Sequence, residues 1–266
     1  MNSSIWLDIL QLAAQNIYNE VSKTRLSYAG LENREFKHLL DDAAQRTLIN
    51  TLQEEHVSAQ LISEEGNLLI GGGGPVVIAD PVDGTTNLAR GIHPAVTCLS
   101  VSDNCMFSGT IAAVIKNLYT GETYIAERNR GAKLDGYPIR VAAPRQPRAA
   151  LISIDISKTP KLDRITPLLN TCRYIRMFGS SANELSLIAS GNLDAHIDIR
   201  GTLRATDTAA ALTILTEAGG TYAVNGVVGV DFPLSKETTM ELVATSNNLL
   251  LDELLNLTRP PSDTLV

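Results

Sequence analysis

Apolar residues recur at three- and four-residue spacing in two segments near the start of the chain. Residues 4–23 and roughly 38–55 both show this period, which predicts two amphipathic helices. After them, AQLISEEG and PVVIAD predict short strands, and NLLIGGGG between them predicts a flexible loop by its composition. The segments TCLSVSD, MFSGTIAAVIKN and TGETYIAER are separated by Gly and Asn turns, so we expect a meander of antiparallel strands.

The second half of the chain alternates strand-like and helix-like segments. ALISIDI, CRYIRMFG and DAHIDIR predict strands, whereas LDRITPLLNTC, SANELSLIASG and residues 205–218 predict helices. This order predicts a mixed α/β (α+β) architecture of layered sheets and helices. Two prolines in AAPRQPR mark a boundary, so we predict an N-terminal α+β subdomain at residues 1–145 and a C-terminal α/β subdomain at residues 146–266.

Composition excludes some classes of protein without identifying a function. The 266 residues include 44% hydrophobic residues, which is enough for a globular interior. With 22 basic and 29 acidic residues the net charge is −7, which argues against nucleic acid or an anionic membrane as the partner. The three cysteines lack metal-binding spacing, and the N-terminal segment lacks the basic region and cleavage site of a signal peptide. No apolar run is long enough to span a bilayer, so we expect a soluble, cytoplasmic protein.

The strongest chemical signal is the segment ADPVDGTTNLARG at residues 79–91. A predicted strand ends at Asp80, and Asp83 follows three residues later, close enough across a tight bend to share a cation. Gly84 permits a close backbone approach, and the Thr-Thr-Asn run after it favours a helix start, where N–H groups bind phosphate. Two carboxylates beside such a helix start suit Mg²⁺ that bridges to a phosphate. The alternative is a turn in which Asp83-Gly84 merely reverses the chain.

Acidic residues in three other segments are ambiguous when taken alone. Glu64 and Glu65 end a predicted strand, where a carboxylate beside the aspartate pair could join a metal cluster, although adjacent glutamates usually lie on the surface. Asp207 would lie at the start of a long apolar helix, where the helix dipole favours any anion or a simple cap. Asp41 and Asp42 open or enter the second predicted helix, and a helix-start charge is the simpler explanation for them.

Taken in order, SEEG, ADPVDGTTNLARG and ATDTAAALTILTEAGG resemble the inositol monophosphatase family, part of the lithium-sensitive, magnesium-dependent phosphatase superfamily. The resemblance covers about residues 37–222. The arrangement also resembles that of the archaeal branch, which hydrolyses both inositol monophosphate and fructose 1,6-bisphosphate. It implies a layered αβαβα sandwich of the sugar phosphatase type, two or three Mg²⁺ ions and a homodimer. It also implies that the N-terminal subdomain carries the metal motifs and that the C-terminal subdomain completes the active site.

Matched position by position, the resemblance implies roles for individual residues. The Mg²⁺ ions would be held by four carboxylates and one backbone carbonyl, those of Glu64, Asp80, Asp83, Asp207 and Val82. Thr85 and Asp41 would act with Glu64 in catalysis, Thr85 orienting the attacking water with Asp41 as its partner. Backbone N–H groups of Gly84 and Thr85 would bind the phosphate.

The resemblance also implies contacts to the rest of the substrate. Ser180, Ser181 and Asp198 fall where the family contacts the alcohol part of its substrate. Arg200 and Arg204 are close in the sequence and could meet a second phosphate, because guanidinium groups recognise phosphate well. The partner expected is therefore a small phosphorylated metabolite.

The sequence thus predicts a magnesium-dependent phosphatase that hydrolyses inositol monophosphate, fructose 1,6-bisphosphate or both with metal-activated water. Two alternatives stay open. DPVDGTT is similar to the Asp-x-Asp-Gly-Thr nucleophile motif of haloacid-dehalogenase-type phosphatases, although its aspartates are three residues apart rather than two. A non-catalytic module of the same fold would bind metal or phosphate without turnover, although buried carboxylates are costly without their cations.

Overall fold

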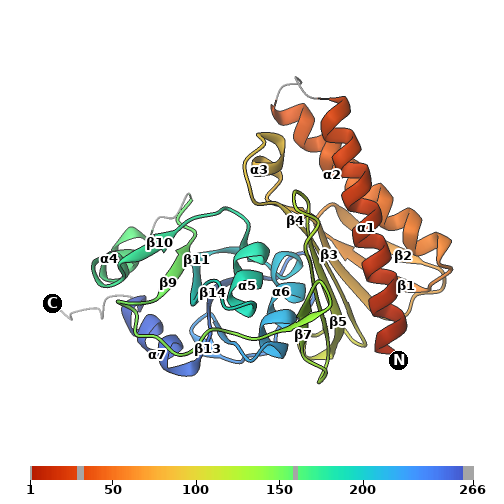
Figure 1. The fold of residues 1–266 in the computed structure, drawn as a ribbon. Helices are drawn as coiled ribbons and strands as arrows, with labels where there is room; N and C mark the ends of the chain where they lie inside the picture. Colours follow the sequence, from red (N-terminus) through yellow and green to blue (C-terminus); the bar gives the residue numbers. More distant parts are fainter. Residues whose placement is uncertain (1, 29–32, 158–160, 260–266) are drawn as a thin grey trace.

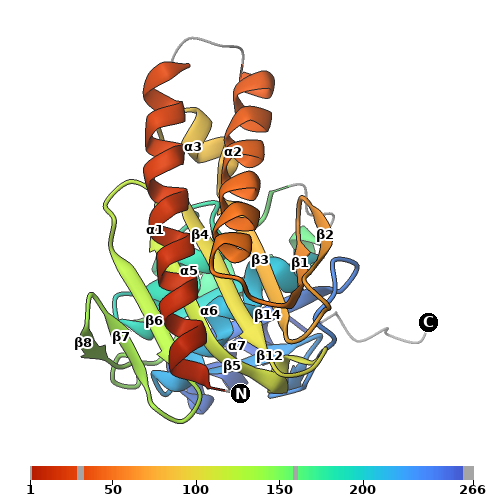
Figure 2. The same cartoon turned by 90° about the vertical axis from the view of Figure 1, so that its right-hand side faces the viewer.

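The computed structural model describes residues 2–28, 33–157 and 161–259, in which two β-sheets alternate with layers of helices (Figures 1 and 2). The described part of the first sheet has the strand order β2 (Gly66–Ile70), β1 (Ala59–Ser63), β3 (Val76–Asp83), β4 (Val96–Ser102), β5 (Thr110–Asn117), β6 (Thr123–Glu127), β7 (Ala132–Leu134) and β8 (Tyr137–Ile139). The second has the order β10 (Tyr174–Arg176), β9 (Leu151–Ile154), β11 (Ala195–Arg204), β14 (Thr239–Thr245), β12 (Thr221–Val224) and β13 (Val227–Val228).

Helices cover both sheets and fill the space between them. They are α1 (Ser3–Ser27), α2 (Asn33–Glu54), α3 (Thr85–Ala89), α4 (Leu162–Thr171), α5 (Ser181–Ala189), α6 (Ala205–Glu217) and α7 (Asn248–Leu257), with a short 3₁₀ helix η1 (Phe107–Gly109). Among these helices, none is both long and apolar enough to cross a membrane.

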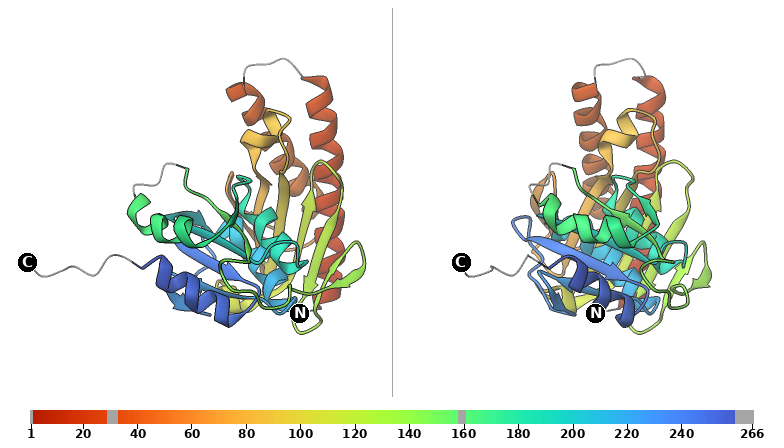
Figure 3. Two further views of the ribbon diagram at one scale, coloured as in Figure 1. Left: turned by 60° about the vertical axis from the view of Figure 1, so that its left-hand side comes forward. Right: turned by 90° about the vertical axis from the view of Figure 1, so that its left-hand side faces the viewer.

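The core has three parts, one for each helical layer. The long helices α1 and α2 pack on the outer face of the first sheet, where Leu10 and Leu48 contribute to one cluster. Helices α5 and α6 lie between the sheets, and α4 and α7 pack on the outer face of the second sheet (Figure 3). Residues 205–215 of α6 are all buried, as suits this central position. The layered αβαβα sandwich predicted from the sequence is confirmed.

The strands of the first sheet precede the predicted boundary in the sequence and those of the second sheet follow it, but the hydrophobic core spans the boundary. Strands of the first sheet end at residue 139, and those of the second begin at residue 151. The central cluster nevertheless joins both halves, because Leu185 and Leu212 from the second half pack with Ile78 from the first. The division into subdomains at residues 1–145 and 146–266 therefore stays a prediction.

Most predicted elements are confirmed, including the antiparallel meander from β4 to β8. Two interpretations were wrong. The segment NLLIGGGG is not a loop throughout, because residues 66–70 form β2, which pairs antiparallel with β1. Asp41 and Asp42 do not open the second helix, because α2 begins at Asn33 and places both aspartates in its interior.

The β1–β2 hairpin has a direct consequence for the candidate chemistry. Glu64 and Glu65 form the hairpin turn, and the glycine run lies at the opposite end of β1, where Ala59 pairs with Ile70. The chain then returns as β3, which is parallel to β1 with Ser63 opposite Ala79. This register places Glu64, the residue after β1, beside Asp80 of β3.

Candidate active site

A cavity of about 400 Å³ opens where the carboxyl ends of β1 and β3 face the start of α6. Its lining is almost entirely polar and consists of Lys37, Glu64, Asp80, Val82, Asp83, Gly84, Thr85, Thr86, Asp155, Gly179, Ser181, Arg200, Leu203, Arg204 and Asp207. All the predicted metal ligands and both predicted phosphate-binding residues are among them. Of the other predicted site residues, Ser181, Arg200 and Arg204 line the cavity, whereas Asp41, Ser180 and Asp198 do not.

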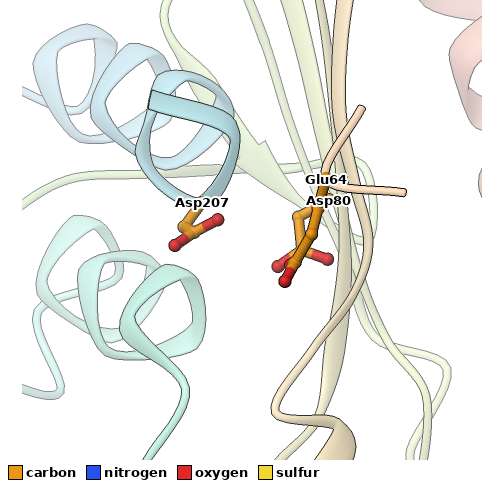
Figure 4. A group of neighbouring side chains, drawn as sticks. All are labelled: Glu64, Asp80 and Asp207. Carbon is orange, nitrogen blue, oxygen red and sulfur yellow. The ribbon is translucent and has the colours of Figure 1, made fainter. Parts of the chain in front are cut away.

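Three carboxylates converge in this cavity from three elements. Glu64 follows β1, Asp80 is on β3, and Asp207 is in the first turn of α6 (Figure 4). One oxygen of each lies within 4.8 Å of the other two. Burial raises the pKa of Asp80 and Asp207, since water no longer solvates their charge fully. Three neighbouring carboxylates that offer oxygen donors fit a hard divalent cation such as Mg²⁺.

The bend after Asp80 gives this site its local geometry. The pairing of β3 with β4 shifts register between Asp80 and Asp83, so both side chains reach the cavity. The Val82 backbone N–H donates to Asp80 Oδ1 at 3.0 Å, which fixes the carboxylate. The Val82 carbonyl accepts the Thr85 hydroxyl at 2.9 Å and retains a second lone pair that a cation could use.

Asp83 lines the same cavity, but it is outside the cluster of three carboxylates. Its Oδ2 accepts the Ser180 hydroxyl at 2.9 Å and the Ala182 backbone N–H at 2.8 Å. Burial, followed by the nearby Asp207 carboxylate, raises the pKa of Asp83 to about 7. The carboxylate is therefore held by the start of α5. A nearby cation would favour its ionised form.

Gly84 is required by both its backbone angle and its surroundings. Its φ of +92° lies in the left-handed region that favours glycine. An added Cβ would lie 3.0 Å from the Pro94 carbonyl oxygen and 3.3 Å from Ser180 Cβ. Gly84 also caps α3, so the predicted helix start is confirmed, although the cap is this glycine and not a threonine side chain.

Thr85 and Asp41 are joined by a hydrogen bond between distant segments. The Thr85 hydroxyl oxygen lies 3.0 Å from Asp41 Oδ1 and 2.9 Å from the Val82 carbonyl oxygen. Because a hydroxyl has one proton, Thr85 can donate to only one of them at a time. Burial raises the pKa of Asp41 to about 7, although the Thr85 hydrogen bond opposes this. Asp41 does not line the cavity, but its carboxylate accepts a hydrogen bond from Thr85, which does.

The predicted substrate contacts divide into two groups. Ser181, Arg200 and Arg204 face the cavity. Ser180 and Asp198 are buried, with exposed fractions of 1% and 0%, and hold other residues in place. Ser180 holds Asp83, and Asp198 binds the Arg200 guanidinium with Oδ1 2.9 Å from Nε and Oδ2 2.6 Å from Nη2.

Two charged residues that line the cavity were missed in the sequence. Lys37 is four residues before Asp41 in α2, and its Nζ donates to Thr86 Oγ1 at 2.6 Å. The spacing of four was an available signal, because such residues share one helix face. Asp155 follows β9 and lies 3.0 Å from Arg200 Nη2. Its position after a strand resembles that of Asp80, but no surrounding motif distinguished it.

Comparisons with known proteins agree with this geometry. A profile of the inositol monophosphatase family matches residues 6–249. The chain is 26% identical over 253 residues to the fructose-1,6-bisphosphatase/inositol-1-monophosphatase of Methanocaldococcus jannaschii, a match that covers 91% of this chain and 97% of that protein. It is 32% identical over 245 residues to the bifunctional NADP phosphatase/NAD kinase of Methanococcus maripaludis, covering 82% of this chain and 42% of that protein. The solved structure of inositol monophosphatase-II from Staphylococcus aureus has the same fold, with a TM-score of 0.83 at 20% identity over 100% of this chain and 99% of the other.

Proposed function

The chain belongs to the inositol monophosphatase family and is a phosphoric monoester hydrolase, and we propose that it uses magnesium to hydrolyse a small sugar or cyclitol phosphate. The observation that carries the proposal is the convergence of Glu64, Asp80 and Asp207 in a polar cavity that Asp83 also lines. These carboxylates and the Val82 carbonyl would hold two or three ions. When bound, magnesium would act as a Lewis acid, making water a better nucleophile and stabilising charge on the phosphate and leaving group.

Residues of the chain itself would position the reacting groups. Thr85 can donate its proton to Asp41 or to Val82, which leaves its oxygen lone pairs free to accept a hydrogen bond from the attacking water. Asp41, with a pKa of about 7, could then accept a proton through Thr85. Gly84 and Thr85 also line the cavity, and their backbone N–H groups would orient the phosphate.

The cavity favours a compact, hydroxyl-rich substrate over a nucleotide. Its volume of about 400 Å³ is at the low end for ligand sites. None of the described residues that line the cavity is aromatic, so a nucleotide base would find no stacking partner among them. Inositol 1-phosphate and fructose 1,6-bisphosphate therefore fit the proposal better than NADP or 3′-phosphoadenosine 5′-phosphate. The proposal also includes a homodimer and a cytoplasmic location.

The proposal is tested by phosphate release from these four compounds with Mg²⁺, using wild type, Asp80→Asn and the exposed control Asp252→Asn. Wild type and the control should release phosphate, and EDTA and Asp80→Asn should each abolish release. No release by wild type from any compound, with Mg²⁺ still bound, would favour a non-catalytic binding module. A trapped aspartyl-phosphate would favour the haloacid-dehalogenase-type mechanism.

A further inference from the structure

Arg204 occupies a junction between two elements of the candidate site. It is the last residue of β11 and the N-cap of α6, with an extended backbone at φ −94° and ψ 158°. Its backbone N–H donates to Asp207 Oδ2 at 3.2 Å, which fixes the position of its main chain. The side chain enters the cavity and stays about one-third exposed, at 33%.

The Arg204 guanidinium binds two members of the carboxylate cluster. Its Nη2 donates to Glu64 Oε1, and its Nε lies 3.6 Å from Asp207 Oδ2. Glu64 and Asp207, with Asp80, are the residues whose oxygens lie within 4.8 Å of one another. The guanidinium and the proposed cation would therefore draw on the same carboxylates.

The other positively charged residues of the cavity have different partners. The Arg200 guanidinium is paired with Asp198 and Asp155, and neither belongs to the cluster. Lys37 donates to the Thr86 hydroxyl. Among the basic residues that line the cavity in the described part of the chain, Arg204 is thus the one with an observed ion pair to the cluster.

We propose that Arg204 competes with the divalent cation for Glu64 and thereby limits how tightly the protein binds metal. The inference rests on the proposed function, since it takes the carboxylate cluster to be the metal site. Before Glu64 Oε1 can bind a cation, its ion pair with Nη2 must open. The free energy needed to break that pair offsets part of the attraction between the carboxylates and the cation. Metal affinity is therefore lower than it would be for the carboxylates without Arg204.

The competition is tested by calorimetric titration of Mg²⁺ and Mn²⁺ into the substrate-free protein. Wild type is compared with Arg204→Gln, Arg204→Lys and the matched control Lys37→Gln. We expect Arg204→Gln to bind the cation about fivefold more tightly, as expected for release from a partly exposed ion pair. Arg204→Lys should fall between wild type and Arg204→Gln, because an ammonium group cannot reproduce the geometry of a guanidinium.

The control separates competition for Glu64 from a general effect of cavity charge. Lys37→Gln removes one positive charge from the same cavity and should leave metal affinity within about twofold of wild type. Unchanged or weaker affinity in Arg204→Gln would overturn the inference, as would equal tightening in both glutamine variants. If Arg204→Gln fails to fold, an affinity in Arg204→Lys equal to that of wild type would overturn it instead.

Failure of this inference can be distinguished from failure of the proposed function. Phosphate release is measured on the same wild-type sample. If wild type releases phosphate with Mg²⁺ while Arg204→Gln binds metal no more tightly, the role of Arg204 is wrong and the proposed function stands. If wild type neither binds Mg²⁺ nor releases phosphate from any of the four compounds, the proposed function fails.

Discussion

The side chains of Asp83 and Ser180 meet although 97 residues separate them, with Ser180 Oγ donating to Asp83 Oδ2 at 2.9 Å. Asp83 ends a strand of the first sheet, and Ser180 is the N-cap of α5 beside the second sheet. The Ala182 backbone N–H donates to the same oxygen at 2.8 Å. A carboxylate of the first half of the chain is thus oriented by donors from the second half, so the start of α5 is part of the candidate site.

Replacement of Ser180 tests whether this orientation matters for metal binding. In Ser180→Ala, Asp83 keeps only the Ala182 N–H at Oδ2, so its carboxylate is less well fixed. We expect metal affinity and kcat/KM to fall about tenfold and the free energy of unfolding to fall by about 1 kcal/mol. Calorimetric titration, phosphate-release kinetics and urea denaturation measure these three quantities.

Ser186→Ala is the matched control for the loss of a buried hydroxyl. Ser186 is on the same helix, has an exposed fraction of 1% like Ser180, and donates to the Ala182 carbonyl at 2.8 Å. It should lose a similar amount of stability without a change in metal affinity. Equal losses of metal affinity in the two variants would show that Ser180 acts only through general stability.

Gly84→Ala should disrupt the site through backbone strain and steric contact together. The added methyl group would lie 3.0 Å from the Pro94 carbonyl oxygen at a φ of +92°. We expect a stability loss of about 1–3 kcal/mol and loss of most phosphate release, because the wall that would orient the phosphate must shift. Gly136 has a similar φ of +84° with nothing within 4 Å of an added Cβ. Gly136→Ala should therefore lose about 1 kcal/mol of stability from backbone strain alone and keep full activity. A loss of activity in Gly136→Ala would show that strain alone, without the contact at Gly84, is enough to lower phosphate release.

The sequence was most informative where the signal was contiguous. Asp80, Asp83 and Gly84 fall within one short segment, so their proximity followed from a strand and a tight bend. Glu64 is beside Asp80 because β1 and β3 are parallel, and strand-like patterns do not show which strands pair. The mistaken loop at residues 67–74 hid this pairing, because β2 is an exposed edge strand without a regular alternation of apolar residues.

Long-range ion pairs were the least predictable part of the site. The pair between Arg204 and Glu64 joins residues 140 positions apart, and nothing local in either segment indicates it. The hydrogen bond from Thr85 to Asp41 also joins distant segments, and the family resemblance, not the place of Asp41 in α2, was the reason to expect it. Local pattern thus predicted the layers and the acidic motif, whereas the partners of each side chain required the packed structure.

Glu184 gives a prediction for the pH dependence of stability. It is fully buried, and burial raises the pKa of its carboxyl to about 8. A folded-state pKa above the unfolded value means that the folded state binds the extra proton. The resulting stability is fully present below about pH 4.5 and is lost as pH rises through about 8. The free energy of unfolding of wild type, measured by urea denaturation, should therefore fall between pH 5 and pH 8. The fall should be smaller in Glu184→Gln.

His196, the buried neighbour of Glu184, does not affect the comparison between wild type and Glu184→Gln. His196 Nδ1 lies 3.4 Å from Glu184 Oε2, and burial lowers the pKa of His196 to about 4. Because His196 is present in both proteins, its own titration contributes to both curves. Glu253→Gln, at an exposed position on α7, controls for the loss of any carboxylate. A loss of stability in Glu184→Gln between the two pH values as large as that of wild type would show that Glu184 is not the group responsible.

Asp41 should set the acid limb of the activity profile. Its pKa is about 7, chiefly because it is buried, so below that pH it is protonated and cannot accept a proton through Thr85. At saturating Mg²⁺ we expect kcat/KM to fall towards tenfold per pH unit below about pH 7. Asp83 also has a pKa of about 7, but a nearby cation would hold it ionised. Asp41→Asn should therefore lower activity at pH 8 by roughly a hundredfold and flatten the acid limb. If the acid limb persists unchanged in Asp41→Asn, a different group accepts the proton, and Asp83 becomes the first candidate to replace in the same way.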